Sequence, residues 1–155
     1  MSDNKPKGSI FAEVEKFRSG GAEKPKPMAI HKTKVLVVDD NAILLRTVKE
    51  MIGSRYQVSI AASASQAFTA ISKSAPDIIL LDYEMPYTNG VEMLKKLRSS
   101  IETMNIPVIF FTSSAEREIV AKIVEYNPDG YLLKPPNKEK MIAIIDKTLA
   151  AKNGV

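Results

Sequence analysis

The sequence has no cysteine and only one histidine among its 155 residues. Without cysteine, a disulfide framework and a thiolate metal site are excluded. No apolar run approaches the roughly 18 residues that a membrane-spanning helix needs, and residues 1–7 lack the apolar stretch of a secretion signal. We therefore expect a cytoplasmic protein with no membrane insertion. We also expect the lone His31, which lies in the N-terminal tail, to be solvated rather than a ligand.

Most of the chain also lacks an excess of either charge sign, although the net charge is +4. Residues 1–34 hold eight Lys and Arg against four Asp and Glu, whereas residues 35–155 hold fourteen of each. Because the excess lies in a tail and the body is neutral, we expect no nucleic-acid partner. The tail is predicted to be solvated, with a weak tether to an acidic partner as the alternative.

Residues 1–33 have the composition of a basic arm or linker, with Lys-Pro and Gly-Gly pairs. One segment, Ser9 to Arg18, has a capping serine and an apolar face made of Ile10, Val14 and Phe17. A helix this short is unstable alone, so it docks on the body, docks on a partner or stays mobile. Residues 151–155 are expected to form a C-terminal tail.

Between residues 34 and 150, five short apolar runs alternate with five amphipathic segments. The predicted strands are 34–38, 56–61, 78–81, 108–112 and 131–133. Short runs rich in β-branched residues, joined by helical crossovers, are typical of a parallel sheet that is covered on both faces. We predict an α/β, flavodoxin-like (βα)5 doubly wound sheet of five parallel strands, in the order 2-1-3-4-5.

Helix signals support this pattern. Asn41 is placed to cap the first helix and Gly53 to end it, with a predicted inward stripe made of Leu44, Val48, Met51 and Ile52.

The second strand is expected to alternate through Tyr56, Val58 and Ile60. Residues 113–116 form a capping box for a later helix, with Ile119, Ile123 and Val124 inward. Asn127 is a suitable left-handed residue at the end of that helix.

Polar side chains follow four of the strands where each strand ends. Asp39 and Asp40 follow the first strand, Asp82 the third, Thr112 ends the fourth, and Lys134 follows the fifth. In the predicted strand order these ends meet at one edge of the sheet, where ligands bind in such folds. Taken separately, the two adjacent acids could be only a helix cap, and the threonine only a strand-end hydroxyl.

Three carboxylates in one small site raise each other's pKa and therefore need a cation. Lys134 supplies one charge, and Mg²⁺ (or Mn²⁺) would supply two and take oxygen ligands. We expect Asp40, Asp82 and the backbone carbonyl of Glu84 to bind the ion directly, and Asp39 to act through a water. A carboxylate beside a metal and a lysine suits phosphoryl transfer. Asp82 is then the nucleophile that forms an acyl phosphate.

The motifs Asp39-Asp40, Asp82-x-x-Met85-Pro86-x-x-Asn89-Gly90, Thr112 and Gly130-Tyr131-x-x-Lys134-Pro135 together resemble the receiver domain of two-component response regulators. The resemblance covers residues 34–150. It implies that a partner histidine kinase or histidine phosphotransfer protein supplies the phosphoryl group. It also implies that Thr112 and Tyr131 act as switch residues, and that the Lys134–Pro135 peptide is cis.

Three residues, Leu45, Tyr131 and Pro136, are candidates for contacts with partner proteins. Leu45 either packs inward or contacts the kinase, as its helix does in the family. The resemblance implies that Tyr131 and Pro136 lie near the surfaces that partners use. Pro136 replaces the usual bulky apolar residue, and Ser113 stands where alanine or glycine is common. Neither change removes a residue that the phosphoryl-transfer chemistry needs.

We expect a single-domain, chemotaxis-type response regulator whose phosphorylation alters binding to a downstream protein or passes the group on in a phosphorelay. Because only a short tail follows residue 150, we expect no output module, and because there is no ATP-binding motif, we do not expect a kinase. The alternative is a phosphorylation-independent protein-binding module. A multiple-turnover phosphatase is disfavoured, because no cap insertion is visible and Glu84 stands where such enzymes carry a second aspartate.

Overall fold

The computed structural model describes residues 32–113 and 117–153. The predicted helix at 9–18, His31 and most of the predicted capping box lie outside these residues. The sheet contains β1 (Lys34–Val38), β2 (Gln57–Ala61), β3 (Ile78–Leu81), β4 (Val108–Thr112) and β5 (Gly130–Leu133). Every pairing is parallel, and the strand order is β2-β1-β3-β4-β5. The predicted fold class is therefore confirmed.

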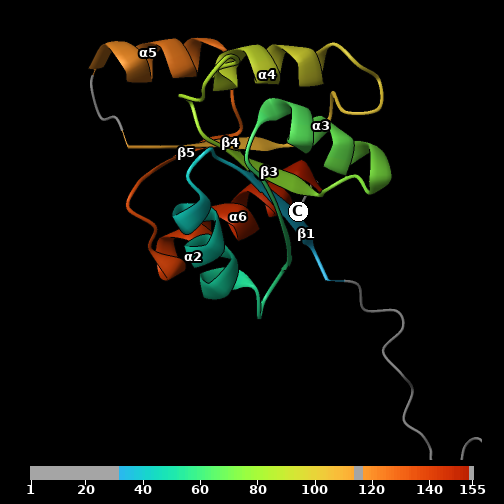
Figure 1. Ribbon diagram of the computed structural model, residues 1–155, viewed down its shortest axis with the longest axis vertical. Helices are drawn as coiled ribbons and strands as arrows, with labels where there is room; N and C mark the ends of the chain where they lie inside the picture. Colours follow the sequence, from blue (N-terminus) through green and yellow to red (C-terminus); the bar gives the residue numbers. More distant parts are fainter. Residues whose placement is uncertain (1–31, 114–116, 154–155) are drawn as a thin grey trace, which may run out of the picture. The chain divides into compact units, whose positions relative to one another are not determined.

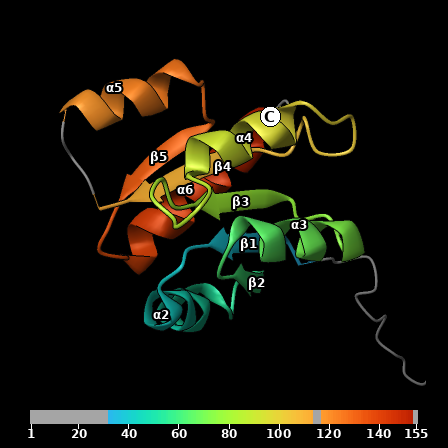
Figure 2. The ribbon, with the colours of Figure 1, turned by 45° about the horizontal axis from the view of Figure 1, so that its top comes forward.

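In the part of the chain that the structure describes, five helices cover the two faces of the sheet: α2 (Ala42–Ile52), α3 (Ala64–Lys73), α4 (Gly90–Arg98), α5 (Arg117–Glu125) and α6 (Lys138–Lys152). Figures 1 and 2 show α3, α4 and α5 on one face and α2 and α6 on the other. Each face has its own apolar core, because strand side chains alternate between the two sides. The strands β3 and β4 are buried along their whole length.

Capping side chains determine where the helices begin. The side chain of Asn41 accepts hydrogen bonds from the backbone N–H groups of Ile43 and Leu44. Ser63, Asn89 and Asn137 act in the same way at α3, α4 and α6. These contacts satisfy N–H groups that lack a partner within the helix. The loops before α2, α4 and α6 carry site residues, so these three helices start directly after the site.

Two predicted inward residues, Ile60 and Val124, were misplaced. In α2 the predicted Val48 and Ile52 are buried, and the predicted Leu44 and Met51 are partly buried against the same core. Leu45, which the predicted stripe did not include, is also buried. Val124 of α5 is 60% exposed, and Ile60 is exposed because β2 is an edge strand.

The loop between β3 and α4 is packed against the strand that carries the central carboxylate. The Gly90 N–H donates to the Tyr83 carbonyl over 2.7 Å. A Cβ atom at Gly90 would lie 2.7 Å from the Phe110 ring and would also meet the Asp82 carbonyl. Only glycine fits this approach. Asn127 adopts the predicted left-handed conformation, with a φ of 57°.

Candidate functional site

The strand ends bring the predicted site residues together at the carboxyl edge of the sheet. Backbone hydrogen bonds continue the strand pairing past the strands themselves: the Asp82 N–H donates to Val38 O over 3.0 Å, and the Lys134 N–H donates to Thr112 O over 2.8 Å. The Asp39 N–H likewise donates to Ala61 O over 3.1 Å. The acidic and basic side chains therefore project from a rigid frame rather than from free loops.

Lys134 joins two of the carboxylates. Its Nζ lies 2.6 Å from Asp39 Oδ2 and 3.5 Å from Asp82 Oδ1. The other oxygen of Asp39 accepts a hydrogen bond from the Asn41 N–H over 2.9 Å. Asp39 is thus held by partners on both of its oxygens, one from β5 and one from the start of α2. The Lys134–Pro135 peptide that follows is cis, as predicted.

Three carboxylates converge at this point. Asp39, Asp40 and Asp82 each offer an oxygen within 4.8 Å of the others. Asp39 is 1% exposed and Asp82 6% exposed, whereas Asp40 lies at the open rim. Within the residues that the structure describes, this is the one group of acidic and histidine side chains arranged to hold a metal ion.

The electrostatics of Asp82 follow from this arrangement. Burial raises the pKa of Asp82 from 3.8 to about 6, and the nearby Asp39 carboxylate adds to the increase. Lys134 and the Glu84 N–H oppose this change and lower the pKa. The site therefore holds more negative charge than its single lysine neutralises.

A divalent ion fits the donor set. Carboxylate oxygens are the ligands that Mg²⁺ prefers, and the excess negative charge of three acids beside one ammonium is the condition that such an ion relieves. Asp40 and Asp82 are the candidates for direct binding, since Asp39 already has a hydrogen-bonding partner on each oxygen. The Glu84 side chain is exposed, and a role for its carbonyl stays a prediction.

The two predicted switch residues lie on neighbouring strands. Thr112 is buried at the carboxyl end of β4, close to the backbone of Lys134. Tyr131 of β5 is half-buried and packs against the core beside α3, α4 and α5. It is paired in register with Phe110, whose ring contacts Tyr83 edge-on at 6.2 Å. Their switching roles stay predictions.

The residues predicted to bind partners are placed differently. Leu45 is 3% exposed and packs in the core, so of its two proposed roles the burial supports packing. A direct contact with a kinase does not fit this burial. Ile43, two residues earlier, is the exposed apolar side chain of α2. Pro136 is half-buried at the rim beside the site.

Two contributors to the site were not found from the sequence. The Asn41 N–H fixes Asp39, and Phe111 places its ring 5.6 Å from Lys134 Nζ, a cation–π distance. Asn41 was read only as a helix cap, although its position two residues after Asp39 was a usable signal. Phe111 carried no such signal, because its proximity to Lys134 depends on the pairing of β4 with β5.

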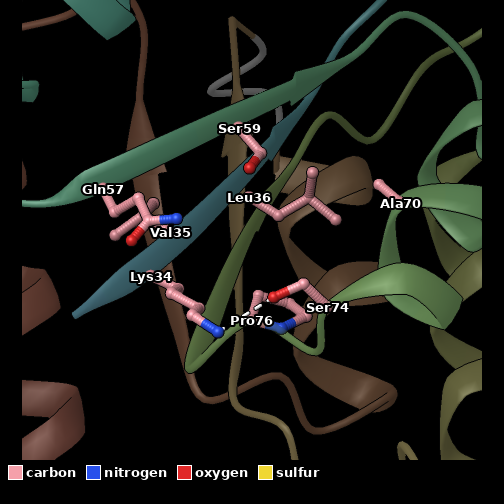
Figure 3. Close-up of a pocket in the computed structure, with 8 residues that line it drawn as sticks. All are labelled: Lys34, Val35, Leu36, Gln57, Ser59, Ala70, Ser74 and Pro76. Atoms are coloured by element: carbon pink, nitrogen blue, oxygen red, sulfur yellow. Dashed lines mark hydrogen bonds between the residues drawn. The ribbon is translucent and has the colours of Figure 1, made fainter. Parts of the chain in front are cut away.

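A polar pocket at the opposite edge of the sheet has a structural explanation. It measures about 70 Å³, and Figure 3 shows Lys34, Gln57, Ser59 and Ser74 lining it. Lys34 Nζ donates to Ser74 Oγ over 2.9 Å. Ser74 caps the end of α3, where the free carbonyls carry partial negative charge. The lysine therefore stabilises a helix end, and we assign no chemistry to this pocket.

The folded body is similar to known proteins. The family model for the response regulator receiver domain matches residues 35–146. The chain is similar to the chemotaxis protein CheY4 of Vibrio cholerae, with 26% identity and a TM-score of 0.71, over 76% of this chain and 99% of that one. Within the described residues, no helix is long and apolar enough to cross a membrane.

Two curated relatives are longer proteins. The chain is 33% identical to a protein-glutamate methylesterase/protein-glutamine glutaminase of Trichodesmium erythraeum over 78% of this chain and 36% of that protein. It is 31% identical to the phosphate regulon transcriptional regulatory protein PhoB of Pseudomonas aeruginosa, over 74% of this chain and 51% of that protein. The chain thus spans about half or less of each relative, and their whole-protein activities are not transferred to it.

Proposed function

The chain belongs to the response regulator receiver domain family, and we propose that it is a phosphorylation switch in which Asp82 accepts a phosphoryl group from a phosphohistidine. The observation that carries this proposal is the convergence of Asp39, Asp40 and Asp82 at one sheet edge, with Lys134 paired to Asp39 and Asp82. A helix cap would explain adjacent acids after one strand. It would not explain a third acid and a lysine from two other strands.

In the proposed reaction an Asp82 oxygen forms a bond to phosphorus while the phosphorus–nitrogen bond breaks. The electron pair of that bond stays on the imidazole, which is the leaving group. Lys134 pairs with a phosphoryl oxygen, and the Thr112 hydroxyl donates a hydrogen bond to another. Bound Mg²⁺ supplies neutralisation of the charge that develops on the phosphoryl oxygens.

Each acid has a distinct proposed role. Asp82 is the phosphoacceptor and also a metal ligand, together with Asp40 and the carbonyl of Glu84. Asp39 holds Lys134 and reaches the metal through a water. This division agrees with the exposure of Asp40 at the rim and with the occupied oxygens of Asp39.

The proposed phosphoryl transfer indicates which classes of protein would be partners. A cytoplasmic histidine kinase or phosphotransfer protein is the proposed donor. The output is proposed to be a protein contact that changes when Thr112 and Tyr131 rearrange, or onward transfer of the phosphoryl group. The chain is proposed to act as a switch rather than as a multiple-turnover enzyme.

The test is incubation with acetyl phosphate and Mg²⁺, followed by intact-protein mass spectrometry. We expect one added phosphoryl group on the wild-type chain and none on Asp82→Asn. As a matched control, Glu50→Gln removes an exposed acid of α2 and should not change labelling. If the wild-type chain gains no phosphoryl mass and binds no Mg²⁺, the phosphorylation-independent binding module becomes the better reading.

A further inference from the structure

An open apolar groove lies far from the acidic site, between α3 and the connection that follows α4. It has a volume of about 550 Å³. Its walls come from Phe68, Ile71 and Ala75 on one side and from Ser100 and Thr103 on the other. These segments belong to the face covered by α3, α4 and α5, as Figure 2 shows for the helices. The groove is a cavity of the size that accepts a large side chain.

The same connection carries apolar side chains that face water. Ile101 is 83% exposed, although it stands between groove-lining residues Ser100 and Glu102. Met104, three residues later, is also an exposed large apolar residue. Removing a side chain of this size from water is favourable. One surface therefore presents both a projecting apolar group and a hollow.

We propose that this surface is the interface of a weak twofold dimer, in which Ile101 of each copy enters the groove of the other. Twofold symmetry requires a surface that is complementary to itself, and a projection beside a hollow meets that requirement. The charges agree. Lys73 and Glu102 are exposed beside the groove, one of each sign, so the surface complements a second copy better than a strongly acidic or basic partner.

The position of the surface separates this dimer from the phosphorylation chemistry. The connection after α4 leads into the amino end of β4, whereas Asp82 lies at the carboxyl end of β3. Both acidic sites therefore stay open in the dimer. We expect self-association to be the same for the wild-type chain and for Asp82→Asn, so a failed phosphorylation test would leave this inference standing.

The dimer is expected to be weak, because one groove and two side chains are small against the roughly 800 Å² per partner of a stable interface. Sedimentation equilibrium of the full chain over a concentration series measures it. Ile101→Glu should raise the dissociation constant by at least about tenfold, since two apolar contacts are lost per dimer. Val124→Glu, at an apolar residue of α5 that is 60% exposed, should leave the constant unchanged.

A mixing experiment tests the twofold arrangement itself. Ala75→Arg blocks the groove, so it should also abolish association on its own. Mixed with Ile101→Glu, it should restore a heterodimer, because one groove contact is intact and the introduced glutamate meets the introduced arginine in the other. Far-UV circular dichroism establishes that each variant is folded.

Three results would overturn the proposal. The wild-type chain could stay monomeric at all concentrations, which would leave the groove to a different partner. Val124→Glu could weaken association as much as Ile101→Glu. The two groove variants could fail to associate when mixed, although each is folded.

Discussion

Replacing Asp82 with asparagine should stabilise the protein in the absence of metal. The two side chains have nearly the same shape, so the change removes a negative charge with little disturbance of packing. Asp82 lies beside the Asp39 carboxylate and is 6% exposed. Its pKa is raised from 3.8 to about 6, which means that the folded state disfavours the ionised form.

The magnitude follows from the pKa. Each unit corresponds to about 1.36 kcal/mol, so the increase from 3.8 to about 6 sets an upper value near 3 kcal/mol. Solvent at the open rim screens part of this energy, and we expect a gain of about 1–3 kcal/mol. For a domain of this size the melting temperature should rise by roughly 3–6 °C per kcal/mol.

The pH dependence has a defined sign. Between pH 3.8 and about 6 the folded state keeps a proton that the unfolded chain releases. The wild-type free energy of unfolding therefore falls as pH rises through this window. The Asp82→Asn variant lacks this loss, so the difference between the two proteins should vanish at the acid end and be complete above about pH 6.

Urea unfolding in EDTA, followed by far-UV circular dichroism, measures this difference. The control is Glu50→Gln, which removes the same charge from an exposed position and should change stability by less than about 0.5 kcal/mol. Saturating Mg²⁺ should stabilise the wild-type chain more than the variant, because binding favours only the folded state. A variant that is no more stable than the wild type in EDTA near neutral pH would refute the reasoning.

Three further substitutions test contacts at the site and in the rest of the fold. Lys134→Met should lower the free energy of unfolding, measured with urea, by about 2–4 kcal/mol, because it leaves buried Asp39 without its cation. A decrease below about 0.5 kcal/mol contradicts this. Tyr56→Phe should cost about 1–2 kcal/mol, since the hydroxyl donates to Asp146 over 2.7 Å and burial raises the pKa of Tyr56 to about 12; an unchanged urea midpoint speaks against it. Gly90→Ala should cost at least about 2 kcal/mol through overpacking against Phe110, and a melting temperature equal to wild type excludes that contact.

The sequence alone was sufficient for the fold class. Buried runs such as Ile78–Leu81 can be satisfied only inside a sheet covered on both faces, and Asn41, Ser63 and Asn89 mark where helices begin. The strand order was predicted as that of a flavodoxin-like sheet, one of the common orders for this alternation of strands and helices. The strand and helix signals themselves are local, because each depends on residues within a few positions of one another.

The site was predictable to the level of residue types. Carboxylates and a lysine at strand ends must meet once the strands are parallel, and the structure brings Asp39, Asp40, Asp82 and Lys134 together. Their pairing was not predictable. That Lys134 lies closer to Asp39 than to Asp82, and that Asn41 holds the other oxygen of Asp39, depends on distances between elements far apart in the chain.

Only the tertiary structure decided which apolar side chains are buried. Leu45 and Ile43 lie two residues apart on α2, yet one is in the core and the other faces water. Val124 fits the helical period of α5 but lies on its outer side. A periodic pattern determines that a helix has an apolar face, but the rotation of that face is set by the packing of the sheet and neighbouring helices, which no local pattern contains.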